Sequence, residues 1–161
     1  MSAALLTLTG TSIVLLMASL LLAFVAETSM EITRHVLLGV FGTFLNLLAH
    51  SLMIFYLIGK GKAIKEAVTE HGLGGDYVAR VSQVRAPVFA RATIAMTITM
   101  VAAIVGASVD VQVLPPWPHA TIALVSVAVN FYALLSEISA LRGSSLIVNE
   151  VNKRLEDSPP A

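Results

Sequence analysis

A histidine near the middle of a long apolar segment is the residue best placed to carry chemistry in this chain. His50 lies within residues 35–59, a run dominated by apolar side chains. An ionisable side chain at that depth in a bilayer is costly, so it usually has a function. A neutral imidazole can ligate a metal or haem iron, relay a proton, or hydrogen-bond a polar group on another helix.

Four apolar segments would position this histidine. They cover residues 4–26, 35–59, 87–108 and 120–141, and each exceeds the roughly 18 residues that mark a membrane-spanning helix. The composition agrees, because 57% of the residues are hydrophobic and only 12% are charged. We therefore predict an all-α integral membrane protein of one domain, residues 1–161, folded as a four-span transmembrane helix bundle within the lipid bilayer.

The basic residues are distributed unevenly around these segments. Nine of the ten lie in or beside residues 60–86 or after the fourth segment, namely Lys60, Lys62, Lys65, Arg80, Arg85, Arg91, Arg142, Lys153 and Arg154, whereas Arg34 lies on the other side. Lys and Arg favour the cytoplasmic side of a membrane. We therefore expect a prokaryotic-type inner (plasma) membrane protein with both termini in the cytoplasm. Acidic residues are mixed with the basic ones, which argues against a nucleic-acid partner.

Helical extensions are predicted on the cytoplasmic side. Residues 60–70 continue the second segment with helix-favouring residues, and a glycine-rich run ends it. Asp76 is predicted to cap a short helix that reaches Arg85, and Pro87 to start or kink the third span. Residues 144–155 carry apolar residues at helical spacing and are predicted to form a short amphipathic helix.

The two outer connections differ in character. Thr28 and Glu31 have the spacing of a capping box that opens the second helix. The second connection, residues 110–119, contains Pro115, Pro116 and Pro118. These three prolines predict that this connection is not helical.

Small and polar residues align on one face of the second segment, as shown by His35, Gly39, Gly42, Thr43, Asn46 and His50. Small residues in a membrane helix mark a face that packs closely on another helix or a flat ligand. One interpretation is a packing seam in which His50 hydrogen-bonds a polar group such as Asn130. The other is a face that binds haem b, with His50 as an axial ligand of the iron and the glycines against the porphyrin.

The spacing of the two histidines on this helix bears on the haem hypothesis. His35 and His50 would lie about 22 Å apart along one helix. This spacing resembles the two-histidine helix of b-type cytochromes, which implies one haem near each membrane face.

Several residues could complete such a site. Met96 and Met100 on the third span lie near the depth of His50, and a thioether can serve as the second axial ligand. A second subunit's copy of His50 or five-coordinate iron are the alternatives, and both methionines can also be simple packing residues. His119 lies at the outer end of the fourth segment, level with His35, so the two could ligate one metal or haem, or each could simply be solvated.

One further pair of charged residues falls inside the spans. Arg91 in the third segment and Glu137 in the fourth are predicted to lie at the same depth near the cytoplasmic face. Mutual pairing is the least costly way to hold both charges there, so we predict a structural ion pair. A proton or anion path is the alternative.

The absent motifs narrow the function. The chain contains no cysteine, no His-Glu zinc motif, no glycine-rich phosphate loop and no Ser/His/Asp set, so we expect a non-enzymatic protein. The first hypothesis is an accessory or scaffold subunit of a homo-oligomer or larger membrane complex. The second is a b-type haem protein that relays electrons or senses a redox or gas signal through His50. The third is a small transporter or channel.

Overall fold

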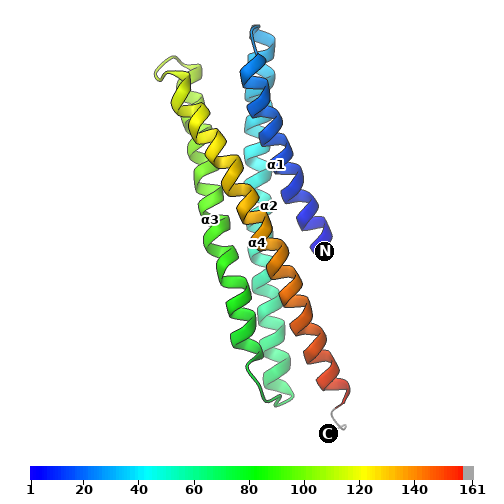
Figure 1. The fold of residues 1–161 in the computed structure, drawn as a ribbon. Coiled ribbons are helices and arrows are strands. Elements are labelled where there is room, and N and C mark those ends of the chain that lie inside the picture. Colours follow the sequence, from blue (N-terminus) through cyan, green and yellow to red (C-terminus); the bar gives the residue numbers. More distant parts are fainter. Residues whose placement is uncertain (158–161) are drawn as a thin grey trace.

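The protein is a bundle of long α-helices (Figure 1), described for residues 1–157 by a computed structural model. The helices are α1 (Ser2–Val25), α2 (Ser29–Glu70), α3 (Tyr77–Asp110) and α4 (Pro116–Glu156). Each of the four contains a stretch long and apolar enough to cross a membrane. The prediction of an all-α, multi-pass, four-span bundle is therefore confirmed.

The helices are arranged so that each packs against its neighbours in the chain. α1 packs on α2, α2 on α3 and α3 on α4, and α4 closes the bundle against α1. α1 is the shortest helix, and its N-terminus lies part-way along the bundle while the other three helices continue past it (Figure 1). The molecule therefore has a four-helix part and a three-helix extension, which we define as residues 60–86 together with residues 142–156.

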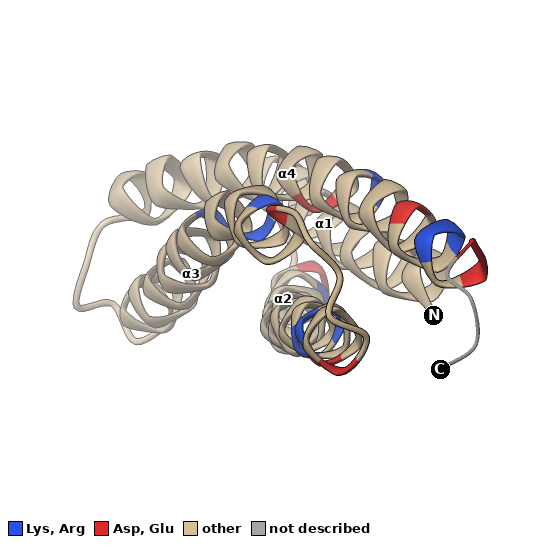
Figure 2. Ribbon diagram, turned by 90° about the horizontal axis from the view of Figure 1, so that it is seen from below, with Lys and Arg blue, Asp and Glu red and all other residues tan. Residues whose placement is uncertain are grey.

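The three-helix extension has its own apolar core. Ile64 from α2, Tyr77 and Val81 from α3, and Ile147 and Val151 from α4 are all buried in one cluster. An ion pair between Arg80 and Glu150, with 2.9 Å between guanidinium and carboxylate, ties α3 to α4 at its surface. Figure 2 views this end of the molecule and shows charged residues on the near ends of α2, α3 and α4. A charged surface over a small apolar core is the pattern expected outside the bilayer.

The extension is continuous with the spans, which corrects two predicted boundaries. α3 runs without interruption through Pro87, although a proline removes one backbone hydrogen bond from a helix. Pro87 and Gln83, whose carbonyl loses its partner, are both exposed, so water can replace that bond. The predicted helix 144–155 is likewise part of α4, because Ile147 and Val151 continue the buried face of that helix.

The turns at the end of the bundle opposite the three-helix extension confirm one prediction and correct part of another. The capping box is present, since the Thr28 hydroxyl accepts from the backbone N–H of Glu31 and the Glu31 carboxylate accepts from that of Thr28. The prediction that residues 110–119 are not helical holds for residues 111–115 and was wrong for Asp110 and residues 116–119, which belong to α3 and α4. Pro115 is the N-cap of α4, so Pro116 lies in the first turn, where backbone N–H groups have no intrahelical partner to lose.

The face of α2 that carries small residues packs on α1. A Cβ placed on Gly42 would lie 3.3 Å from the Leu15 Cβ and 3.4 Å from the Leu16 backbone nitrogen. The opposite face of α2 exposes large apolar side chains such as Phe41, Phe44 and Phe55, as expected for contact with lipid. Gly42 therefore permits a close approach of α1 and α2.

We expect the Gly42→Leu substitution to lower the free energy of unfolding in detergent by about 1–3 kcal/mol, because the larger side chain must push α1 away. Gly59→Leu is the matched control, since a Cβ on Gly59 would meet nothing within 4 Å. Thermal unfolding of both variants beside the wild type measures the difference. Equal losses in the two variants would contradict the close packing of α1 on Gly42.

Candidate functional site

A layer of polar side chains crosses the middle of the four-helix part, and every helix contributes to it. The Asn46 amide nitrogen on α2 donates to the Ser12 hydroxyl on α1 at 3.2 Å and to the Asn130 amide oxygen on α4 at 2.7 Å. The Asn130 amide nitrogen donates to the Thr99 hydroxyl on α3 at 2.8 Å. These four side chains are at most 1% exposed. Their hydrogen bonds replace the water that a bilayer interior lacks.

The direction of these hydrogen bonds is set by one backbone carbonyl. The carbonyl oxygen of Ser126 can only accept, and it lies 2.8 Å from the amide nitrogen of Asn130. This contact identifies which atom of the Asn130 amide is the nitrogen. The amide oxygen therefore points towards α2. Asn46 must then present its own nitrogen to that oxygen, as it does.

His50 is held between two residues of α4. Its Nε2 lies 2.9 Å from the Asn130 amide oxygen, and its Nδ1 lies 2.6 Å from the Glu137 Oε1. The hydrogen bond from His50 to Asn130 agrees with the packing-seam interpretation, in which His50 bonds a polar group such as Asn130. Since the Asn130 oxygen cannot donate, Nε2 must carry a hydrogen.

The 2.6 Å contact between His50 Nδ1 and Glu137 Oε1 requires one further proton, because two lone pairs at that distance would repel. With Nε2 protonated, the contact at Nδ1 is either an imidazolium beside a carboxylate or a neutral imidazole beside a carboxylic acid. Both arrangements contain the same number of protons and have no net charge. Both side chains are 0% exposed. The buried His50–Glu137 pair can therefore share one proton.

Two oxygen atoms of this network have no hydrogen-bond partner among the described residues. They are the second carboxylate oxygen of Glu137, Oε2, and the amide oxygen of Asn46, Oδ1. Buried acceptors are nearly always satisfied in native proteins, so each unpartnered one marks a place where a water, proton or ion has reason to bind. The hydrogen bonds of the Asn130 amide are therefore complete, whereas Asn46 and Glu137 each keep one unpartnered oxygen.

The predicted ion pair between Arg91 and Glu137 is not formed, and this is a correction. Glu137 contacts His50, whereas the Arg91 guanidinium donates to the Ser136 hydroxyl and lies 4.4 Å from the centroid of the Tyr132 ring. The physical reason is the helical rotation of about 100° between consecutive residues. Ser136 faces α3 and Glu137 faces α2, so equal depth does not bring Arg91 and Glu137 together.

His50 does not fit an axial haem ligand in this arrangement. Iron ligation needs a free lone pair on a ring nitrogen, and both nitrogens of His50 are engaged with Asn130 and Glu137. Met96, the suggested second ligand, accepts a hydrogen bond from Ser51 at 3.7 Å. Gly42, which would lie against the porphyrin under the haem interpretation, packs on α1. In this arrangement His50 therefore offers no free nitrogen to a haem iron.

His35 and His119 come together at the other end of the bundle. Their ring centroids are 6.0 Å apart, and the rings meet edge to face. Gly39, on the same face of α2 as His35, makes room for the Ser19 hydroxyl, because a Cβ there would lie 3.0 Å from it. The pair is therefore a second cluster of potential ligands, well separated from His50 along the helices.

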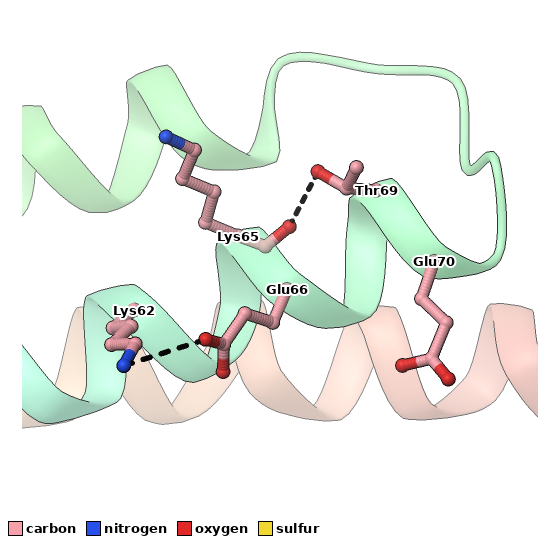
Figure 3. Close-up of a pocket in the computed structure, with 5 residues that line it drawn as sticks. All are labelled: Lys62, Lys65, Glu66, Thr69 and Glu70. Atoms are coloured by element: carbon pink, nitrogen blue, oxygen red, sulfur yellow. Dashed lines mark hydrogen bonds and ion pairs between the residues drawn. The ribbon is translucent and has the colours of Figure 1, made fainter.

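The surface hollow drawn in Figure 3 belongs to α2 alone and holds no converging set of groups. It is lined by Lys62, Lys65, Glu66, Thr69 and Glu70. Lys62 and Glu66 form an exposed ion pair at 3.6 Å, and Thr69 bonds the Lys65 carbonyl of its own helix. Exposed ion pairs of this kind contribute little to stability, so we place no site here.

The sequence indicated Asn46, His50, Asn130 and Glu137 as inward-facing residues but did not single out Ser12 or Thr99. Both are hydroxyl residues in apolar helices, where Ser and Thr commonly bond their own backbone, as Thr99 also does with Ala95.

Comparison with protein-family models, curated proteins and solved structures finds no match to this chain. The function must therefore be inferred from the geometry of the site.

A double-mutant cycle tests the assigned partner of Glu137. Removing one member of a buried pair leaves the other uncompensated, so His50→Leu and Glu137→Leu should each cost about 3–5 kcal/mol of unfolding free energy. The double variant should lose less than the sum by about 1–3 kcal/mol. In the parallel cycle of Arg91→Leu with Glu137→Leu, the losses should add to within about 0.5 kcal/mol. Coupling confined to the Arg91 cycle would restore the ion pair expected from the sequence.

Proposed function

We propose that this protein is a small proton-linked membrane transporter or channel in which the His50–Glu137 pair binds the proton. The observation that supports this most directly is an ionisable pair that is completely buried within the four-helix part and has one carboxylate oxygen unpartnered. Ionisable residues that face the interior of a membrane bundle typically mark proton relays and ion pathways.

Packing energetics alone do not explain why the ionisable pair of His50 and Glu137 is buried here. A buried ion pair is often no more stabilising than apolar residues of the same volume, because both groups lose their hydration. The polar layer of Ser12, Asn46, Thr99 and Asn130 already links all four helices without an ionisable group. His50 and Glu137 therefore add chemistry that the layer does not need for cohesion.

The geometry links the shared proton to the contact between α2 and α4. If that proton leaves, the lone pair of Nδ1 faces the carboxylate at 2.6 Å, and the two repel. The ring cannot shift its proton from Nε2 to Nδ1 without losing its bond to the Asn130 oxygen. Loss of the proton therefore requires the ring to turn or the two helices to separate. A proton that is coupled to helix movement is the element that alternating access requires.

Polar residues continue from this pair toward the outer end along the inner faces of the helices. Ser12 and Ser19 lie seven residues apart on α1 and are both buried. Ser19 bonds His35 at the outer end, while Ser12 bonds Asn46 at the middle. This series supports a polar route along the axis of the bundle, with Glu137 on the predicted cytoplasmic side of Asn130.

Proton flux into proteoliposomes tests this proposal, with a pH-sensitive dye inside and an imposed pH gradient and membrane potential. Wild-type protein should carry protons faster than protein-free vesicles. Glu137→Gln should reduce the flux to the protein-free level, because the Gln amide can still donate to His50 Nδ1 but cannot take up or release the proton. Glu66→Gln, on the exposed face of α2, is the matched control and should behave as wild type. Equal flux through wild type and Glu137→Gln would refute the proposal.

A second function, an accessory or scaffold subunit that assembles with itself, is favoured by one face of α1. Thr7 and Thr11 are exposed on this face, and a Cβ on Gly10 would meet nothing within 4 Å. Small residues allow close approach between membrane helices, where apolar area alone supplies no driving force. This face is therefore suited to pack against the same helix of another copy.

The oligomeric state of Gly10→Leu tests this second function. If α1 faces pack together, the added side chain should shift an oligomer toward monomer, as measured by sedimentation in detergent or by subunit counting in lipid. Gly59→Leu places the same side chain on an open position of α2 and should leave the oligomer intact. A monomeric wild-type protein would contradict self-assembly.

A further inference from the structure

We propose that His35 and His119 form a binding site for a transition-metal ion at the outer end of the bundle. The two imidazoles come from α2 and α4, and their ring centroids are 6.0 Å apart. This site is distinct from the His50–Glu137 pair, and its test does not depend on proton transport.

Both histidines have one ring nitrogen fixed by a backbone carbonyl. His35 Nδ1 lies 2.8 Å from the Ser19 carbonyl oxygen on α1, and His119 Nδ1 lies 3.0 Å from the Ala102 carbonyl oxygen on α3. A carbonyl oxygen can only accept, so Nδ1 carries the hydrogen in each ring. In the neutral imidazole the lone pair is then on Nε2. This is the arrangement found around metal-ligating histidines, where a second group fixes the tautomer and leaves the other nitrogen for the ion.

The surrounding helices are shaped to hold these rings. A Cβ on Gly106 of α3 would lie 2.8 Å from His119 Cε1 and 3.0 Å from its Nδ1, so only a glycine leaves the space that the ring occupies. The Ser19 hydroxyl donates to the His35 carbonyl at 3.0 Å and adds a second contact to Nδ1 at 3.1 Å. All four helices thus contribute either a ligand or a group that positions one.

The separation of the rings suits a shared ion. An ion about 2.0–2.1 Å from each Nε2 lies roughly 3.2 Å from each ring centroid, so a tetrahedral angle separates the centroids by roughly 5.2 Å and a wider angle by up to roughly 6.4 Å. The observed 6.0 Å falls inside this range, so the two rings can share an ion when both Nε2 atoms face it. Both rings are half-buried, so an ion can reach them from the outer surface.

The donor set indicates the class of ion. Imidazole nitrogens suit zinc, copper and nickel, whereas magnesium and calcium require oxygen ligands. Within residues 1–157 no third His, Cys, Asp or Glu joins the pair. Water or an exchanging ligand would therefore complete the coordination, which leaves the site open and the ion exchangeable.

Zn²⁺ titration of the purified full-length protein in metal-free detergent buffer, followed by calorimetry, tests the site. Wild-type protein should bind one Zn²⁺ per chain, and His35→Ala and His119→Ala should each weaken binding by about tenfold or more. His71→Ala is the matched control, because this histidine is an exposed residue that follows α2 at the opposite end of the molecule. Zn²⁺ should raise the melting temperature of wild type and His71→Ala but not of the other two variants.

Two further measurements distinguish loss of the metal site from loss of folding and identify the ligands of the ion. The melting temperature of each variant without metal shows whether it folds, and His119→Gln provides a polar replacement if His119→Ala does not. The electron paramagnetic resonance spectrum of Cu²⁺ bound to wild-type protein should show hyperfine coupling to two imidazole nitrogens. Unchanged Zn²⁺ affinity in folded His35→Ala and His119 variants, loss of affinity in His71→Ala, or a Cu²⁺ spectrum without coupled nitrogens would each overturn the proposal.

Discussion

The amide of Asn130 is the group on which the arrangement of the four helices depends. Within the bilayer no water is available, so each polar atom must find its partner inside the protein. Asn130 uses its nitrogen for Thr99 and the Ser126 carbonyl, and its oxygen for Asn46 and His50. One side chain of α4 thereby fixes the position of α3 and α2, and Asn46 extends the link to Ser12 on α1. A rotation of any helix would leave at least one of these atoms unsatisfied.

This polar layer also controls what the ionisable residues can do. Because the Asn130 oxygen accepts from His50 Nε2, the ring is oriented so that Nδ1 faces Glu137. A group in water would respond to a change of charge by reorienting solvent. Here the response must come from the protein, through the ring or the helices that carry the pair. Under the proposed function, the same hydrogen bonds that order the bundle would couple proton loss at this pair to a movement of the ring or of the helices.

The two ends of the molecule are specialised differently. At the end carrying most of the basic residues, α2, α3 and α4 continue past α1 around the buried cluster of Ile64, Tyr77 and Val151. At the opposite end, His35 and His119 are oriented by carbonyls of α1 and α3. Between them the outer surface of the helices is apolar and suited to lipid. The polar residues form an internal series, separate from that surface.

The sequence by itself determined the number of spans, the inward face of α2 and the residues that could carry chemistry. Long apolar runs and helical periodicity are local properties, so His50, Asn46, Asn130 and Glu137 could be recognised as polar residues directed into the bundle. The capping box of Thr28 and Glu31 is equally local and was confirmed.

Only the tertiary structure decided which of these residues meet. Depth along a helix can be counted from the sequence, but the direction in which a side chain faces a neighbour depends on how the helices cross. Arg91 and Glu137 share a depth and yet face different helices, whereas His50 lies between two residues of α4 that are seven positions apart. The continuity of α3 through Pro87 was decided in the same way, because the buried faces on both sides of that proline pack against the same neighbouring helices.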